Sequence, residues 1–264
     1  MTPASSSDGW EVCGSEVLGS SHCEQCPHNR RAFCGALNRS FDKLHGDQSR
    51  ACRHHRTVGP GERIASCDEV AKDIFVLCRG WGYRFFVLPD GRRQILNFLL
   101  PGDLLSVVSI FEVRFGSSVD ALTEVEITGF RRTEVKRQLA ASPGLWASWA
   151  ESVAQQVRAS DELLVALGQR TAEERVAYLI LHLTRRMQAL GLAGARRYRF
   201  PLKQTHIADA LGIGSECVCR TLSRFRKRGI LALSGGYVEI SDFAELERIG
   251  SPRGGAGQGS GGGS

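Results

Sequence analysis

The chain has 264 residues, of which 42% are hydrophobic, and it carries a formal net charge of +6. This length suffices for two domains with sizeable cores. No apolar run approaches a membrane span and the N-terminus lacks the pattern of a secretory signal, so we expect a cytoplasmic protein with no membrane partner. Its nine cysteines are then expected to be reduced thiols or metal ligands rather than disulfides.

Residues 1–50 form an arm in which three cysteines are closely spaced. Two residues separate Cys23 from Cys26, and Cys34 follows after seven more. A C-x2-C pair lets two thiolates converge on one metal centre, and the third cysteine closes the loop. The spacing indicates zinc or an iron–sulfur cluster without separating them, and three ordinary thiols are the simpler alternative. The histidines nearby would also permit zinc or haem ligation.

Residues 51–141 read as short apolar or alternating runs separated by turn signals such as Gly59-Pro60-Gly61 and Leu100-Pro101-Gly102-Asp103. The runs are residues 74–77, 83–88, 94–100 and 119–127. Short strands at this spacing predict an antiparallel barrel or jelly roll.

Residues 142–170 are predicted to form one long helix, with Ser142 as N-cap and Pro143 in the first turn. An apolar stripe follows at helical intervals, and such stripes are usually buried against another helix. We expect the same helix of a second subunit to cover it, giving a homodimer, although packing on its own roll is the alternative. The predicted dimer interface comprises Leu145, Trp149, Val153, Val157, Leu164 and Leu167.

Residues 171–250 contain two short helical patterns broken by Gly212-Ile213-Gly214-Ser215, after a capping box from Thr171 to Glu174. Gly212 supplies a left-handed turn and Ser215 is the predicted N-cap of the second helix. After Gly229, two short runs flank Ser234-Gly235-Gly236 and predict a β-hairpin wing. The tail, residues 251–264, is rich in Gly and Ser and is expected to be disordered.

The second helix is basic on its outer face, while Val218, Leu222 and Phe225 are spaced to face inward. Between residues 196 and 228, nine Lys and Arg side chains stand against one Asp and one Glu. This is a winged helix-turn-helix, which places side chains on base edges in the major groove of double-stranded DNA. The predicted DNA-binding residues are Ser215, Glu216, Cys219, Arg220 and Arg224.

A jelly roll, a long helix and a winged helix-turn-helix in this order resemble the Crp/Fnr superfamily of bacterial transcription regulators. The likeness covers residues 52 to about 248 and is specific in PGDLL at 101–105, TAEERVAYLILHLTRRM at 171–187 and IADALGIGSECVCRTLSRFRKRGIL at 207–231. The fold class is then α+β, with a cysteine-bearing arm, a cyclic-nucleotide-binding-like roll, a dimerisation helix and a DNA-binding domain.

The cysteine arm resembles the oxygen-sensing Fnr branch of that superfamily. The resemblance implies a [4Fe-4S] cluster on Cys23, Cys26, Cys34 and one cysteine of the roll, which favours the dimer and its binding to a palindromic promoter until oxygen destroys it. It also implies activation through RNA polymerase. The position expected for the roll cysteine is Thr128, and threonine is a poor iron ligand. The other candidates for the fourth ligand are Cys13, Cys52, Cys67 and Cys78.

The resemblance also places the DNA-reading pair on Glu216 and Arg220, whose side chains suit cytosine N4 and guanine O6 and N7. Fnr-like members have Ser where this chain has Cys219, a weaker hydrogen-bond donor. For the cyclic-nucleotide-sensing branch, Asp103 stands near the expected Glu, but Ser117-Ser118 lacks the expected Arg. We therefore expect no cyclic nucleotide.

No nucleophile–base constellation, nucleotide loop or paired carboxylate suggests an enzyme or electron carrier. The principal hypothesis is a DNA-binding regulator with an iron–sulfur cluster. The alternative is the same regulator without a cluster, switched by thiol oxidation, zinc, haem-bound gas or another effector.

Overall fold

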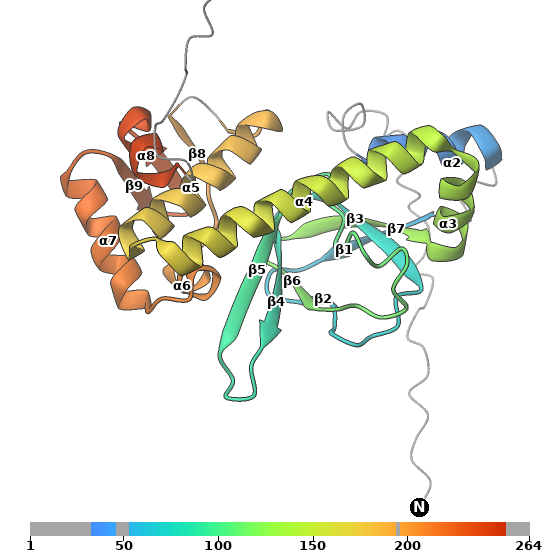
Figure 1. Cartoon of the computed structure of the whole chain (residues 1–264), viewed down its shortest axis with the longest axis horizontal. Helices are drawn as coiled ribbons and strands as arrows, with labels where there is room; N and C mark the ends of the chain where they lie inside the picture. The colour runs from blue at the N-terminus through green and yellow to red at the C-terminus, as the bar shows by residue number, and fades with distance from the viewer. Residues whose placement is uncertain (1–32, 46–52, 194–195, 252–264) are drawn as a thin grey trace, which may run out of the picture.

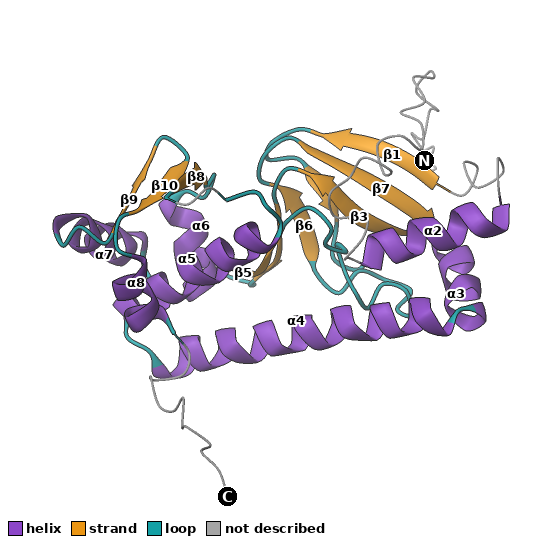
Figure 2. Cartoon of the chain, turned by 90° about the horizontal axis from the view of Figure 1, so that it is seen from above, coloured by secondary structure: helices purple, strands orange, loops and turns teal. Residues whose placement is uncertain are grey.

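The computed structural model describes residues 33–45, 53–193 and 196–251. Its described elements form a β-roll and a C-terminal helical unit on one side of a long helix, α4 (Pro143–Gln169), which runs along both (Figures 1 and 2). The predicted α+β class is confirmed. None of the described helices is long and apolar enough to cross a membrane.

The roll consists of two antiparallel sheets, as the turn-punctuated runs predicted. One sheet has the order β1-β7-β3 and the other the order β2-β6-β4-β5. Apolar side chains from both sheets, such as Leu77, Val119 and Ile127, fill the space between them. The strands are β1 (Arg53–Val58), β2 (Arg63–Ala65), β3 (Asp73–Arg79), β4 (Gly82–Val87), β5 (Arg93–Leu99), β6 (Ser118–Ala121) and β7 (Val125–Arg131).

The turn between β3 and β4 depends on Gly80. Its φ of +86° is left-handed, and a Cβ there would collide with the carbonyl oxygen of Glu124. Only glycine meets both conditions without strain. The run predicted at residues 119–127 is divided by a turn, so it contributes to β6 and to β7 in different sheets.

Two helices that the sequence patterns did not reveal lie beside the roll: α2 (Phe33–His45) and α3 (Arg132–Ala141). On α2, Phe33, Leu37 and Phe41 are spaced four apart, are buried, and form one apolar face. This face packs on the outer side of the β1-β7-β3 sheet, where the rings of Phe41 and Phe130 meet edge to face at 5.3 Å. The arm is thereby anchored to the roll from residue 33 onward.

Helix α4 begins as predicted. The Ser142 side chain accepts the backbone N–H of Leu145 at 3.3 Å, and Pro143 occupies the first turn. Leu145 itself is buried in the cluster that contains α2 and α3, so it packs within its own chain.

The remaining apolar side chains of the α4 stripe lie in three different surroundings. Trp149 and Val153 pack against the α2 cluster, and Leu167 packs against the C-terminal core. Val157 and Leu164 are 52% and 70% exposed. The predicted dimer interface therefore depends on the middle and distal part of the helix, and the dimer remains a prediction.

The C-terminal unit contains the predicted helix-turn-helix and wing. Its elements are α5 (Ala172–Ala189), β8 (Arg197–Arg199), α6 (Gln204–Leu211), α7 (Ser215–Lys227), β9 (Leu231–Ser234), β10 (Tyr237–Ile240) and α8 (Phe243–Gly250). The wing hairpin β9–β10 gains a third strand, β8, and α8 packs against α5. Neither β8 nor α8 was predicted.

The roll and the C-terminal unit share one continuous apolar core, to which Tyr83 and Phe85 of β4 and the preceding Trp81 contribute. Charged pairs border this contact. Arg93 of β5 donates from Nε and Nη2 to one carboxylate oxygen of Asp209 on α6, at 2.8 and 2.7 Å. The sensor-like roll and the first helix of the helix-turn-helix are thus in direct contact.

Candidate nucleic-acid interface and cysteine centre

The turn between α6 and α7 matches the expected geometry with one correction. Gly212 ends α6 in the left-handed conformation, at φ 61° and ψ 35°. The predicted N-cap Ser215 is wrong, because Gly214 takes the extended capping conformation and its carbonyl accepts the first helical hydrogen bond, from Val218 at 3.2 Å. Ser215 is instead the first residue of α7, where its side chain is exposed.

The two faces of α7 are divided as the sequence predicted. Val218, Leu222 and Phe225 are buried against the rest of the C-terminal unit. The outer face presents all five side chains predicted to contact DNA, and all five are exposed: Ser215, Glu216, Cys219, Arg220 and Arg224. Their exposure leaves them accessible to a groove, while their DNA contacts remain predictions.

The two residues predicted to read DNA, Glu216 and Arg220, lie one helical turn apart on this face. Within the described part of the chain, the side chains of these two residues make no hydrogen bond or ion pair. Their polar groups therefore need not break an internal contact before they meet a base pair.

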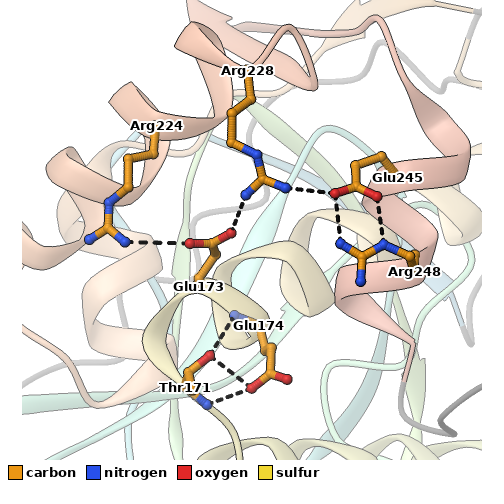
Figure 3. Close-up of polar contacts among 7 residues, drawn as sticks. All are labelled: Thr171, Glu173, Glu174, Arg224, Arg228, Glu245 and Arg248. Carbon is orange, nitrogen blue, oxygen red and sulfur yellow. Dashed lines mark hydrogen bonds and ion pairs between the residues drawn. The ribbon is translucent and has the colours of Figure 1, made fainter.

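Arg224 differs from its neighbours on the outer face, because it is tethered to α5 (Figure 3). Glu173 of α5 accepts from Arg224 at 3.4 Å and from Arg228 at 2.6 Å. Arg228 also donates to Glu245 of α8 at 2.6 Å, and Glu245 accepts from Arg248. This chain of ion pairs fixes the C-terminal half of α7 against α5 and α8.

The capping box that spans Thr171 to Glu174 was predicted from the sequence, whereas this tether was not. Thr171 and Glu174 form the predicted reciprocal box, and hydrogen bonds from Thr171 lower the pKa of the Glu174 carboxyl. Glu173, which directly precedes Glu174, points toward the arginines of α7 (Figure 3). A carboxylate beside a basic helix was visible in the sequence, but the pairing depends on how the two helices cross.

The predicted metal ligands are only partly described. Cys34 lies in the first turn of α2 and is 7% exposed, within the apolar cluster between α2 and the roll. Cys23 and Cys26, and the alternative fourth ligands Cys13 and Cys52, lie outside the described residues, as does the tail from residue 252. Among the described residues, no group of three His, Cys, Asp or Glu side chains could hold a metal ion.

The remaining candidate thiols occupy different surroundings. Cys67 is exposed in the turn after β2. Cys78 lies on β3, and its Sγ is 3.1 Å from Oγ1 of Thr128 on β7. Thr128 is 1% exposed, and its Oγ1 also lies 2.9 Å from Nδ1 of His55 on β1. The structure therefore brings Cys78 directly beside the position at which the fourth cysteine was expected.

The two stretches compared with a phosphate-binding cassette, residues 102–111 and 115–122, are mostly buried in the roll. Arg84 of β4 donates from Nε to the Ser117 hydroxyl at 3.2 Å, and burial lowers the pKa of this guanidinium. Asp103 accepts from the Leu100 N–H at 2.8 Å and from Arg186 of α5 at 2.5 Å. A cation thus reaches Ser117 from a remote strand, which the local pattern did not reveal. The absence of a cyclic nucleotide remains a prediction.

Two family models match the chain. A cyclic nucleotide-binding domain matches residues 55–142, which is the roll, and a Crp-like helix-turn-helix domain matches residues 174–249. Both matches agree with the architecture described above.

Individual relatives span most of the chain. The nitrogen fixation regulation protein FixK of Azorhizobium caulinodans is 33% identical over 186 residues, covering 70% of this chain and 74% of its own. The transcriptional activator protein FnrL of Cereibacter sphaeroides is 28% identical over 228 residues, covering 85% and 90%. The solved structure of FixK2 from Bradyrhizobium japonicum superimposes with a TM-score of 0.68 at 26% identity, covering 75% of this chain and 98% of that one.

Proposed function

The chain belongs to the Crp/Fnr family of DNA-binding transcription regulators, and from that premise we propose that it is a homodimer whose DNA binding responds to oxygen or redox state through an N-terminal iron–sulfur cluster. The family is not enzymatic, and the exposed face of α7 supplies the groups that meet DNA. Membership of the family does not by itself imply a cluster, and the proposal of one rests on the cysteines of the N-terminal arm.

The observation that carries the proposal is the position of Cys34. It lies in the first turn of α2, in the same apolar cluster as the first three turns of α4, including Leu145 and Trp149. Burial with apolar neighbours suits a thiolate that holds an iron–sulfur cluster, whose potential depends on solvent exposure. Cys34 therefore fits such a group, and the other two proposed ligands, Cys23 and Cys26, lie outside the described residues.

Ligation in the arm would act on α4 through this contact. When bound, the cluster supplies an oxygen-labile anchor. The anchored residues would hold α2 against the start of α4 and so bias how α4 meets its copy in a second subunit. Val157 and Leu164, which are exposed, would form part of that contact.

On DNA, the dimer would place two copies of α7 in successive major grooves of a palindromic promoter site. Arg220 would donate to guanine, Glu216 would accept from cytosine, and Ser215, Cys219 and Arg224 would complete the contact surface. Activation through contact with RNA polymerase is expected from the family likeness. The relative FnrL, a transcriptional activator protein, supports this direction.

The proposal is tested by purifying the full chain without oxygen and measuring its visible absorption, iron and acid-labile sulfide. We expect a broad absorption band that bleaches in air, with about four iron and four sulfide per subunit. A colourless protein containing one zinc per subunit, or no metal, would refute the cluster. The same DNA-binding regulator would then be switched by zinc or by its thiols.

A further inference from the structure

We propose that Arg93 and Gln94 of β5 are positioning residues for DNA recognition. They hold α6, and through it α7, at one orientation relative to α4, and they thereby set the spacing between the two half-sites that a dimer can bind. This inference rests on the homodimer proposed above but not on the iron–sulfur cluster. It is carried by the contacts between β5 and the last turn of α6.

Arg93 is fixed on the roll side of this contact as well as on the α6 side. Its Nη1 donates to the Tyr83 hydroxyl of β4 at 2.9 Å, and its guanidinium carbon lies 5.1 and 5.6 Å from the ring centroids of Tyr83 and Phe85. Its Nε and Nη2 donate to one oxygen of Asp209 at 2.8 and 2.7 Å. Because a guanidinium is planar and rigid, contacts on both sides fix the direction of the ion pair. Asp209 is thus held at a defined position against β5.

Gln94 holds the end of α6. Its Nε2 donates to the carbonyl oxygen of Ala210 at 3.1 Å and to that of Ile95 in its own strand at 3.0 Å. Carbonyls in the last turn of a helix have no partner within the helix, so a donor from another element fixes the helix end. In addition, Arg175 of α5 donates to the next carbonyl oxygen, that of Leu211, at 3.4 Å. The roll and α5 therefore hold the end of α6 together.

The orientation of α7 follows that of α6, because the two helices pack as one unit. Only residues 212–214 separate them. Ile207 and Leu211 of α6 are buried in the same apolar cluster as Val218 and Leu222 of α7. A rotation of α6 against the roll would therefore carry α7 with it.

The roll in turn is fixed to α4. The Trp149 indole N–H of α4 donates to the Val107 carbonyl oxygen of the roll at 3.2 Å, and Trp149 packs against the apolar cluster that contains α2. The contacts from β5 to α6 thus connect α7 to α4 through the roll. A separate contact, from Arg186 of α5 to the Phe98 carbonyl oxygen of β5 at 2.9 Å, keeps the C-terminal unit docked when the α6 contact is removed.

The orientation of α7 relative to α4 matters because a two-fold dimer must place both copies of α7 at once. Successive major grooves recur about every 34–36 Å, or about 10 base pairs, so one added base pair moves a half-site by about 3.4 Å and turns it by about 35°. A dimer in which β5 holds α6 meets one spacing without strain. Release of α6 lets α7 adjust to neighbouring spacings, so discrimination between them falls.

The test uses full-length protein purified without oxygen and a palindromic duplex selected from a randomised pool. Binding is measured to this duplex and to versions with one base pair added or removed between the half-sites. Arg93→Ala should reduce the preference for the selected spacing by roughly 10-fold to 100-fold, the range of a hydrogen bond to a charged group. Affinity for a duplex with one half-site should stay at the wild-type value, because the outer face of α7 is unchanged.

The matched control is Arg92→Ala, which should keep the wild-type spacing preference. Arg92 pairs with Asp90 of its own hairpin at 2.7 Å, and its side chain is 76% exposed. Arg93→Lys, which keeps the charge opposite Asp209, should retain part of the preference. Gln94→Ala removes one hydrogen bond to α6 and should relax the preference less than Arg93→Ala, so the test does not depend on the folding of one variant.

Wild-type spacing preference in folded, dimeric Arg93→Ala and Gln94→Ala would overturn the inference and leave the proposed function intact. An equal loss of affinity for the single half-site would also overturn it, because the contact would then maintain structure rather than orientation. A wild type that sediments as a monomer on the palindrome would overturn the proposed homodimer itself, and this inference with it.

Discussion

Replacing Arg220 with alanine should strongly weaken site-specific DNA binding and leave the fold unchanged. Arg220 is exposed on the outer face of α7, away from the buried face formed by Val218, Leu222 and Phe225. A surface substitution that breaks no internal contact changes the free energy of unfolding by less than about 0.5 kcal/mol. Any larger effect must therefore appear in the DNA complex.

The magnitude follows from the contact that Arg220 is placed to make. A bidentate arginine–guanine pair contributes about 1–3 kcal/mol of discrimination. In a two-fold dimer the loss occurs in both half-sites, so Arg220→Ala should weaken specific binding by about 2–6 kcal/mol, roughly 30-fold to 10⁴-fold. Binding to random duplex should change far less.

The assay is selection of the wild-type target from a randomised duplex pool, followed by titration of that duplex at several salt concentrations. The matched control is Arg226→Ala, another exposed arginine of α7. As a phosphate contact, Arg226 should weaken all duplexes alike and reduce the salt slope by about one per subunit. Wild-type specificity in the folded Arg220→Ala variant would show that α7 is not the recognition helix.

Three further predictions concern the fold that carries α7. Asp209→Asn should lower the free energy of unfolding in urea by about 1–3 kcal/mol, because Asp209 pairs with Arg93 at 28% exposure of both side chains. The control Asp90→Asn, in a pair whose side chains are 76% and 51% exposed, should lower the free energy of unfolding far less, and equal losses would contradict the reasoning. Burial first, and neighbouring cations second, lower the pKa of both His182 and His206 to about 4. Because unfolding returns each pKa toward 6.5, the unfolded chain binds more protons between pH 4 and 6.5, so stability should fall as pH decreases through that window. The fall should reach up to about 1.4 kcal/mol per pH unit for His182 and should be smaller for the more exposed His206. Urea titrations at several pH values should show that the free energy of unfolding of His182→Gln depends less steeply on pH than that of the wild type. An unchanged pH dependence would argue against a neutral, buried His182 ring. Gly250→Ala should destabilise the C-terminal unit by about 1–3 kcal/mol in a thermal melt, because its Cβ would lie 2.8 Å from the Ala177 carbonyl carbon. Gly144→Ala, which meets nothing within 4 Å, should be neutral or stabilising, and similar melts for the two variants would refute the close α5–α8 contact.

Much of the fold was predictable because it follows from local patterns. Gly80 and the other turn residues delimit the strands of the roll, Ser142-Pro143 begins α4, and Gly212 ends α6. Each of these features depends on the backbone preference of one or two residues, so it can be predicted from the residue types alone. The single misplaced cap, Ser215, differs by one residue from the true cap, Gly214.

Features that depend on tertiary contacts were not predictable. Helix α2 was missed because its apolar face is only three residues, Phe33, Leu37 and Phe41, inside an arm rich in cysteine, glycine and polar residues. This face stabilises the helix only when the roll buries it. The apolar stripe on α4 was predicted to be a single dimer interface, although the side chains at its two ends pack against other elements of their own chain.

The cysteine centre illustrates the same limit. Counting along the sequence placed the expected fourth ligand at Thr128, and no local pattern singled out Cys78, fifty residues earlier. The two residues become neighbours only through strand pairing and the bulge in β3. Likewise, Arg84 reaches Ser117, and Glu173 reaches Arg224, from elements that are distant in sequence.

The most direct test of the oxygen-switch account is a joint oxygen titration of anaerobically purified protein. Visible absorbance and affinity for the selected palindromic duplex are measured on the same samples. If the cluster controls DNA binding, the band and the affinity should fall together as oxygen is added, and the dimer should dissociate over the same range. Full DNA affinity in completely bleached protein would contradict the account, because the cluster would then not govern α7.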